Sequence, residues 1–232
     1  MHQKNEPSIV LQYNRGFFFC RKVNLLAIAC FLLTSNLCNA NVKAEAKGGV
    51  PMPLVKTGTY TTDYIYNLPD GQRAELIDGQ IYDMAPPNRI HQKIVSGLHY
   101  KIREYIEKNH GSCEVYPAPF AVFLNADDKN YVEPDISVIC NKDKLDDRGC
   151  NGAPDWIIEI VSPSSRKMDY IIKNGKYSES GVREYWIVDS EKERTTVYHH
   201  EEDAAPIIIP FSQPISVGIY ADFDITIADL LK

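Results

Sequence analysis

The stretches YVEPDISVIC (residues 131–140) and APDWIIEIVS (residues 153–162) each place a carboxylate inside an apolar run. The carboxylates belong to Asp135 and Glu159, and both have isoleucine neighbours. Apolar runs rich in β-branched residues predict buried β-strands. A buried, unpaired carboxylate costs several kcal/mol, so it needs a cation, hydrogen bonds or a functional cleft to receive it.

Two such strands can be neighbours in one sheet, where Asp135 and Glu159 together can chelate a hard divalent cation. Mg²⁺ prefers oxygen ligands and usually takes one or two carboxylates, completed by water and substrate phosphate. A metal there would polarise a scissile phosphate and activate an attacking water. The remaining requirement is a positive group near the phosphate, and Lys173 is the candidate.

Each of these residues has a structural alternative. Asp135 could cap a turn after Pro134, and Glu159 could lie on the exposed face of an edge strand, although its apolar neighbours argue against exposure. Asp169 and Lys173 have the i,i+4 spacing of a helix-stabilising ion pair, worth a few tenths of a kcal/mol. Tyr177 is the type of residue that packs in a core and satisfies its hydroxyl with one partner.

Composition indicates one compact soluble domain. The chain has 232 residues, of which 44% are hydrophobic and 24% are charged. From Met52 onward, 19 Lys and Arg face 29 Asp and Glu, a net charge of −10. Because affinity for phosphate comes from clustered Lys and Arg, this acidic body does not resemble a general nucleic-acid binder, and any DNA contact requires a local basic patch.

Cysteine usage favours a reducing compartment. Three of the six cysteines lie near the N-terminus and three in the body, without metal-binding spacing: Cys20, Cys30, Cys38, Cys113, Cys140 and Cys150. An odd number in the body predicts free thiols and a cytoplasmic protein.

The N-terminal residues 1–51 are predicted to be an extension outside the fold. Residues 21–40 resemble a secretory signal, and if that is real the protein is secreted. The alternative is that KGGVPM (residues 47–52) encodes a ribosome-binding sequence ahead of an initiating Met52. The patterned domain then comprises residues 52–232.

The first half of this domain predicts a hairpin, a helix and strands. Asp78-Gly79 suits a type I′ turn within residues 74–84. Isoleucine and leucine recur every fourth residue from Ile90 to Ile106, which predicts an amphipathic helix ending near Gly111. Strands follow in residues 113–125 and 131–140.

Residues 142–152 are charged and glycine-containing, which predicts a surface loop. The run at 155–162 predicts a strand covered on both faces. A helix over 166–179, closed by Gly181, and strands at 184–189 and 195–200 complete the pattern before a short apolar tail. This order predicts an α/β or α+β fold with a mixed central β-sheet flanked by helices.

The order of these motifs resembles the Uma-type restriction endonuclease family, a branch of the PD-(D/E)xK nuclease superfamily. The resemblance rests on EPDISVIC, GAPDWIIEIVSPSS, the four-residue spacing of Asp169, Lys173 and Tyr177, and GVREYWIVD. It extends from about Met52 to the C-terminus. It implies a restriction-endonuclease-like fold, Mg²⁺ (or Mn²⁺) as cofactor and DNA as substrate.

By position, the resemblance implies that Asp135 and Glu159 are the metal-binding acids. The lysine of the (D/E)xK element is replaced by Val161, so Lys173 is the implied substitute. Glu75 resembles an additional catalytic acid near the first helix. His91 matches a family position without a clear role, and Asp169 and Tyr177 are accessory candidates.

Three hypotheses follow. The first is a metal-dependent endonuclease that hydrolyses DNA. The second, motivated by Val161 and the acidic body, is a catalytically weak nuclease-fold module for DNA binding or regulation. The third is an exported protein that uses its acids structurally. No membrane span is expected in the folded domain, and exposed strands offer a route to a homodimer, as is common among duplex-cutting nucleases.

Overall fold

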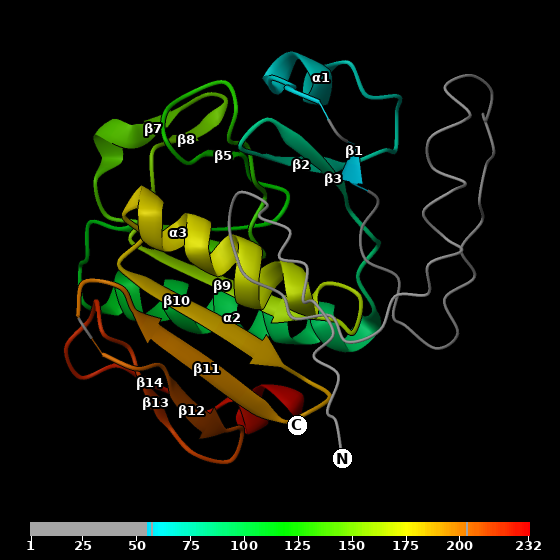
Figure 1. The fold of residues 1–232 in the computed structure, drawn as a ribbon. Helices are drawn as coiled ribbons and strands as arrows, with labels where there is room; N and C mark the ends of the chain where they lie inside the picture. Colours follow the sequence, from blue (N-terminus) through cyan, green and yellow to red (C-terminus); the bar gives the residue numbers. More distant parts are fainter. Residues whose placement is uncertain (1–54, 57, 203) are drawn as a thin grey trace, which may run out of the picture. The chain divides into compact units, whose positions relative to one another are not determined.

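The computed structural model describes residues 55–56, 58–202 and 204–232 (Figure 1). The predicted extension 1–51, its signal-like segment and the Met52 start lie outside the described residues.

A six-stranded mixed sheet forms the centre of the domain (Figure 1). Its strand order is β12-β11-β10-β9-β6-β4, in which β9 and β10 are parallel and the other neighbours antiparallel. The strands are β4 (Glu114–Pro117), β6 (Ile136–Ile139), β9 (Trp156–Val161), β10 (Glu184–Asp189), β11 (Arg194–His199) and β12 (Ile207–Pro210). The predicted mixed central sheet is confirmed.

Helix α2 (Arg89–Lys108) covers one face of this sheet and is the predicted amphipathic helix. Asn88 caps it by accepting a hydrogen bond from the backbone N–H of His91 at 2.9 Å, which satisfies one of the free donors of the first turn. Its buried residues follow the expected spacing, and they pack with Trp156, Ile158 and Trp186 of the sheet.

A second helical segment covers the opposite face and crosses the sheet in Figure 1. It begins as a π-helix, η3 (Met168–Lys173), and continues as α3 (Asn174–Ser180). Gly181 ends it with φ 92°, a left-handed conformation that suits glycine. Tyr177 of α3 packs in the same cluster as Ile157 and Val161 of β9. Because both faces of β9 are covered, its continuous apolar run is explained.

The entry hairpin consists of β2 (Ala74–Ile77) and β3 (Gln80–Asp83), with β1 (Val55–Lys56) paired to β3. Asp78 and Gly79 have φ values of 50° and 74°, so both central residues of the turn have the positive φ of the predicted type I′ geometry. Leu76 and Tyr131 exchange two backbone hydrogen bonds of 2.7 Å, which tie this hairpin to the segment before Asp135. The short helix α1 (Thr62–Tyr66) precedes it.

The segment 142–152 is more ordered than the predicted surface loop. It forms a 3-10 helix, η2 (Lys142–Lys144), and two strands, β7 (Leu145–Asp146) and β8 (Gly149–Asn151), which pair with each other. Strand β8 also pairs with β5 (Val122–Phe123). The carboxylate of Asp146 accepts backbone hydrogen bonds from Arg148 and Gly149, so the turn is stabilised locally while its charged residues face solvent. The charged and glycine-containing composition therefore predicted a loop where the structure has a small sheet.

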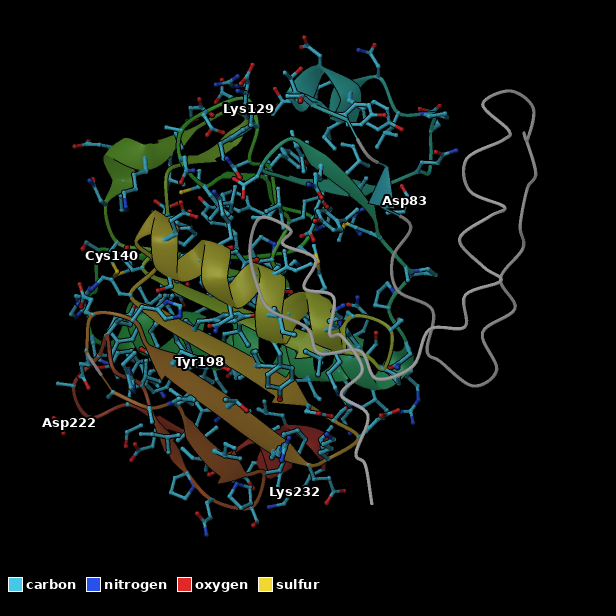
Figure 2. The ribbon with its side chains drawn as sticks, in the orientation of Figure 1. Asp83, Lys129, Cys140, Tyr198, Asp222 and Lys232 are labelled. Atoms are coloured by element: carbon cyan, nitrogen blue, oxygen red, sulfur yellow. A yellow bond between two sulfur atoms is a disulfide. The ribbon has the colours of Figure 1, made fainter. Side chains whose placement is uncertain are left out.

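The prediction of free thiols is wrong for two of the three body cysteines. Cys113 and Cys140 form a disulfide, whereas Cys150 is free and buried. Glu114 pairs with Ile139 in the antiparallel β4–β6 ladder, so Cys113 and Cys140 are the next pair outward. They are 27 residues apart in sequence, and only the strand register brings them together. Cys140 is labelled at this end of the sheet in Figure 2.

The C-terminal segment closes the cluster around α2. Strands β13 (Ile215–Ser216) and β14 (Asp224–Ile225) form a small antiparallel pair, and the 3-10 helix η4 (Ile227–Leu231) follows. Ile215, Ile225 and Ile227 are buried in the same cluster as α2. Within the described residues, no helix combines the length and the apolar character needed to cross a membrane.

We predict that Gly149→Ala lowers the free energy of unfolding by about 2 kcal/mol or more. Gly149 has φ 147°, and a Cβ there would overlap the backbone carbonyl of Ala121. The matched control is Gly175→Ala in α3, where a Cβ meets nothing within 4 Å. That change should leave stability equal or raise it by up to about 1 kcal/mol. Urea unfolding measures both, and equal effects would contradict the packing of β8.

Candidate active site

Asp135 and Glu159 lie on the same face of the central sheet. Ile136 of β6 pairs with Ile158 of β9, so Asp135, one residue before β6, is opposite Glu159 in the antiparallel register. Directly opposed residues project to the same face of a sheet. Ile157 and Val161 lie two residues before and after Glu159, so they project to the same face as Glu159. Both pack in the same cluster as Tyr177, so this face is the one that η3 and α3 cover. Asp135 is further fixed by the backbone N–H of Ile160, which donates to its Oδ2 at 2.8 Å.

The ammonium of Lys173 lies among carboxylates from three elements. Its Nζ is 2.9 Å from Oε1 of Glu159 and 2.9 Å from Oε2 of Glu75, and 3.9 Å from Oδ1 of Asp169. The side chains of Lys173 and of these three acids are only 5–6% exposed. Lys173 is the last residue of the π-helix, and the i,i+4 spacing to Asp169 directs both side chains toward β9. The predicted Asp169–Lys173 pair therefore exists as one edge of a larger cluster.

Glu75 enters this cluster from β2, the first strand of the hairpin. Its Oε1 accepts the backbone N–H of Glu133 at 3.1 Å while its Oε2 contacts Lys173. Arg73, two residues before Glu75, donates to Glu133 and not to Glu75. Glu133 also accepts from the hydroxyl of Tyr131 at 2.6 Å. Arg73, Tyr131 and Glu133 thus form a supporting layer that holds the hairpin against the segment before β6.

Tyr177 and His91 each contact one of the two central acids. The hydroxyl of Tyr177 donates to Oε1 of Glu159 at 2.8 Å, and its ring is fully buried. His91, in the first turn of α2, places Nε2 3.0 Å from Oδ2 of Asp135. Its other ring nitrogen, Nδ1, is buried and has no hydrogen-bond partner among the described residues. Both residues therefore restrict the orientation of a carboxylate.

The site carries more buried negative charge than its one lysine offsets. Burial raises the pKa of Glu159 well above its usual range, the nearby Lys173 ammonium opposes this shift, and Asp135, Asp169 and Glu75 add to it. Burial likewise raises the pKa of Asp169 to about 6, again opposed by Lys173. For Lys173, burial alone would lower the pKa, but Glu159, Glu75 and Asp169 outweigh it and raise the pKa well above the ordinary lysine value.

The donor chemistry of this site fits a hard divalent cation. Three carboxylates surround Lys173, and Asp135 lies opposite Glu159 in the sheet. Oxygen ligands with excess negative charge are what Mg²⁺ or Mn²⁺ requires. The contacts above use Oδ2 of Asp135 and Oε1 of Glu159, which leaves a second oxygen on each outside those contacts. In the described part of the chain, no three His, Cys, Asp or Glu side chains are already arranged as a complete ligand set. Lys173 instead fills part of the space between the acids.

The residues singled out in the sequence therefore form two sets of contacts, one around Glu159 and one at Asp135, and these two acids lie opposite each other in the sheet. Glu75, Asp169, Lys173 and Tyr177 surround Glu159, and His91 contacts Asp135. Val161, at the position of the expected lysine, is buried in the hydrophobic cluster under α3. Sequence reasoning missed the pairing of Glu133 with Arg73. The available signal was the acid two residues before Asp135 in EPD, but its partner is 60 residues away.

We predict that Lys173→Met lowers the free energy of unfolding by about 3 kcal/mol or more, because it leaves buried carboxylates without their cation. Lys176→Met is the matched control on the same helical segment. Lys176 is also buried, but its partners Asp78 and Glu179 are exposed, so its pairs should be worth about 1 kcal/mol or less. Urea unfolding at neutral pH compares the two. Equal losses would show that the Glu159 cluster does not depend on Lys173.

Comparison with known proteins connects this geometry to a family. The profile of the Uma2 family, described as "Putative restriction endonuclease", matches residues 62–224, more than half of the chain. The Synechocystis sp. protein named "Uncharacterized protein slr1290" is 25% identical over 141 residues, which cover 60% of this chain and 73% of that protein.

A solved structure from Anabaena variabilis, titled "a putative nuclease belonging to DUF820", is 22% identical to this chain. It aligns with a TM-score of 0.60 over 73% of this chain and 96% of that chain, which shows a shared fold. The resemblance predicted from the sequence is thus confirmed, and the mixed sheet flanked by helices is the fold of a nuclease-like relative. This chain belongs to the Uma2 family of restriction-endonuclease-like proteins.

Proposed function

We propose that this protein is a metal-dependent endonuclease that hydrolyses phosphodiester bonds of DNA. The observation that carries the proposal is the convergence of Asp135 and Glu159 on one sheet face, next to the buried ammonium of Lys173. An acid pair beside a fixed cation is the arrangement that phosphodiester hydrolysis needs, because charge develops on the phosphate oxygens. Membership of the Uma2 family supports the same conclusion.

Asp135 and Glu159 are the residues that would hold Mg²⁺ or Mn²⁺. When bound, such an ion supplies a Lewis acid for the phosphate and a lowered pKa for a coordinated water. Hydrogen bonds from Ile160 N–H to Asp135 and from Tyr177 to Glu159 keep both carboxylates in place. His91 restrains Asp135 from the opposite layer of the domain.

Lys173 is assigned an electrostatic role. Because the surrounding carboxylates raise its pKa, it remains an ammonium at neutral pH and does not act as a general base. Its Nζ can hold a phosphate oxygen as negative charge increases in the transition state. Glu75 and Asp169 keep the ammonium at the site, so we assign Glu75 a role in positioning Lys173. A direct catalytic role of Glu75 stays a prediction.

The second candidate is a nuclease-fold module that binds DNA or regulates another protein with little catalysis. Val161 favours it, because the position next to Glu159 that would carry the lysine is instead part of the core. The two candidates differ in turnover. They make the same prediction for fold and for the location of the acids.

We predict that purified protein cleaves supercoiled plasmid DNA in Mg²⁺ and that Asp135→Asn and Glu159→Gln each lower the rate at least about 100-fold, equivalent to about 2.7 kcal/mol of barrier. The matched control is Glu107→Gln, which removes an exposed charge on α2 and should retain the wild-type rate. Gel electrophoresis of nicked and linear products gives the rates.

Cleavage that survives both substitutions would remove Asp135 and Glu159 from the active site. A wild-type protein that binds the plasmid but never cleaves it would favour the second candidate. Melting temperatures of all variants show whether a loss of rate reflects unfolding.

A further inference from the structure

A surface groove lies along the outer side of η3, and four of its eight lining residues are cations. Its lining includes Arg166, Lys167, Tyr170, Ile171, Lys192 and Arg194, and we call it the basic groove. These residues come from the start of the helical segment after β9 and from the β10–β11 hairpin. The fold therefore brings cations from two separate segments together in one groove.

The basic groove and the candidate active site share the helix η3. Tyr170 and Ile171 of η3 line the groove, whereas Asp169 and Lys173 of the same helix contact the acids beneath it. Val161 of β9 pairs in parallel with Asp189 of β10, so both strands end at the edge where the groove begins. A polymer lying in the groove therefore passes the end of the strand that carries Glu159.

Three of the four groove cations have no acidic partner. In the described parts of the chain, Lys167, Lys192 and Arg194 form no ion pair, and the Nε of Arg194 is buried without a hydrogen-bond acceptor. Arg166 is different, because it donates to Asp189 at 3.0 Å and to Glu191 at 3.2 Å. In a body with a net charge of −10, three cations that form no ion pair among the described residues differ locally from the overall charge, although Glu191 and Glu193 flank Lys192 in the sequence.

The remaining lining suits a nucleic-acid strand. The hydroxyl of Tyr170 is 3.3 Å from Oγ1 of Thr196, which fixes the end of the ring, and Ile171 is 62% exposed. Aromatic rings beside a basic track provide contact area for sugars and bases, while Lys and Arg contact phosphates without reading sequence. Tyr170 and the cations thus combine the two elements of such a surface.

We propose that the basic groove binds the phosphodiester backbone of duplex DNA next to the bond positioned at Asp135 and Glu159. This inference rests on the proposed nuclease function, and it assigns a substrate-binding surface to a body whose net charge is acidic. Lys167, Lys192 and Arg194 contact phosphates, and the groove contributes affinity without sequence preference.

The test neutralises the three unpaired cations in the full chain with Lys167→Gln, Lys192→Gln and Arg194→Gln combined. The matched control neutralises three exposed cations on α2, across the sheet, with Lys101→Gln, Arg103→Gln and Lys108→Gln. Both triples remove two lysines and one arginine. Fluorescence anisotropy with a short labelled DNA duplex in Ca²⁺ measures affinity between about 50 and 200 mM salt.

The groove variant should bind the duplex on the order of tenfold to a hundredfold more weakly, and the slope of log affinity against log salt should fall in magnitude by about 2 to 3. The α2 control should keep the wild-type affinity, and its slope should differ from the wild-type slope by no more than about 1, the value of one phosphate contact. If Arg194→Gln impairs folding, the exposed pair Lys167→Gln and Lys192→Gln should still lower the slope by about 2.

The groove proposal and the nuclease proposal fail in different ways. Wild-type protein that cleaves plasmid, with a groove variant that binds as tightly as the α2 control, would overturn the groove and leave the nuclease function intact. Groove-dependent binding without any cleavage would support the groove and remove the nuclease function. Equal groove-dependent affinity for phosphatidylserine vesicles would overturn the assignment to DNA, because it would indicate a general anionic surface.

Discussion

The ion pairs of the Lys173 ammonium hold the candidate active site together. It joins β2, β9 and η3 through Glu75, Glu159 and Asp169, all of them buried. Without a cation, these acids would either take up protons or separate, because like charges at such distances cannot all remain ionised in a poorly solvated space. Burial raises the pKa of Asp169 to about 6 although the Lys173 ammonium opposes this shift, so a single lysine does not fully offset the cost of burying these acids. The site thus combines tight packing with a residual demand for positive charge.

Strand register brings the acidic positions of this site together. The antiparallel register of β6 and β9 places Asp135 opposite Glu159, and the parallel register of β9 and β10 ends both strands at one edge. The π-helix then crosses that edge, with Lys173 on its inner side and Ile171 exposed on its outer side. Acids, lysine and basic groove consequently occupy one end of the sheet. We infer that a DNA strand held in the basic groove and a metal held by the acids would meet there.

Local patterns predicted those parts of the structure that depend on neighbouring residues. The Asp78-Gly79 turn, the four-residue spacing in α2 and the unbroken apolar run of β9 follow from backbone preference and burial, and all three are present. The disulfide between Cys113 and Cys140 depends on register between distant strands, and the Arg73–Glu133 pair links residues 60 apart. The family resemblance supplied Glu75 and His91, which no local pattern distinguishes from surface residues. The sequence predicted that DNA binding requires a local basic patch but not where that patch lies, because the cations of the basic groove come from two separate segments.

The most direct measurement of the central claim is a crystal structure of the protein soaked with Mn²⁺, with anomalous scattering recorded from the metal. We predict an anomalous peak that contacts carboxylate oxygens of both Asp135 and Glu159, with the Lys173 ammonium displaced from Glu159. No peak between these two carboxylates, with Lys173 still bound to Glu159 at saturating Mn²⁺, would contradict a shared metal site on this sheet face.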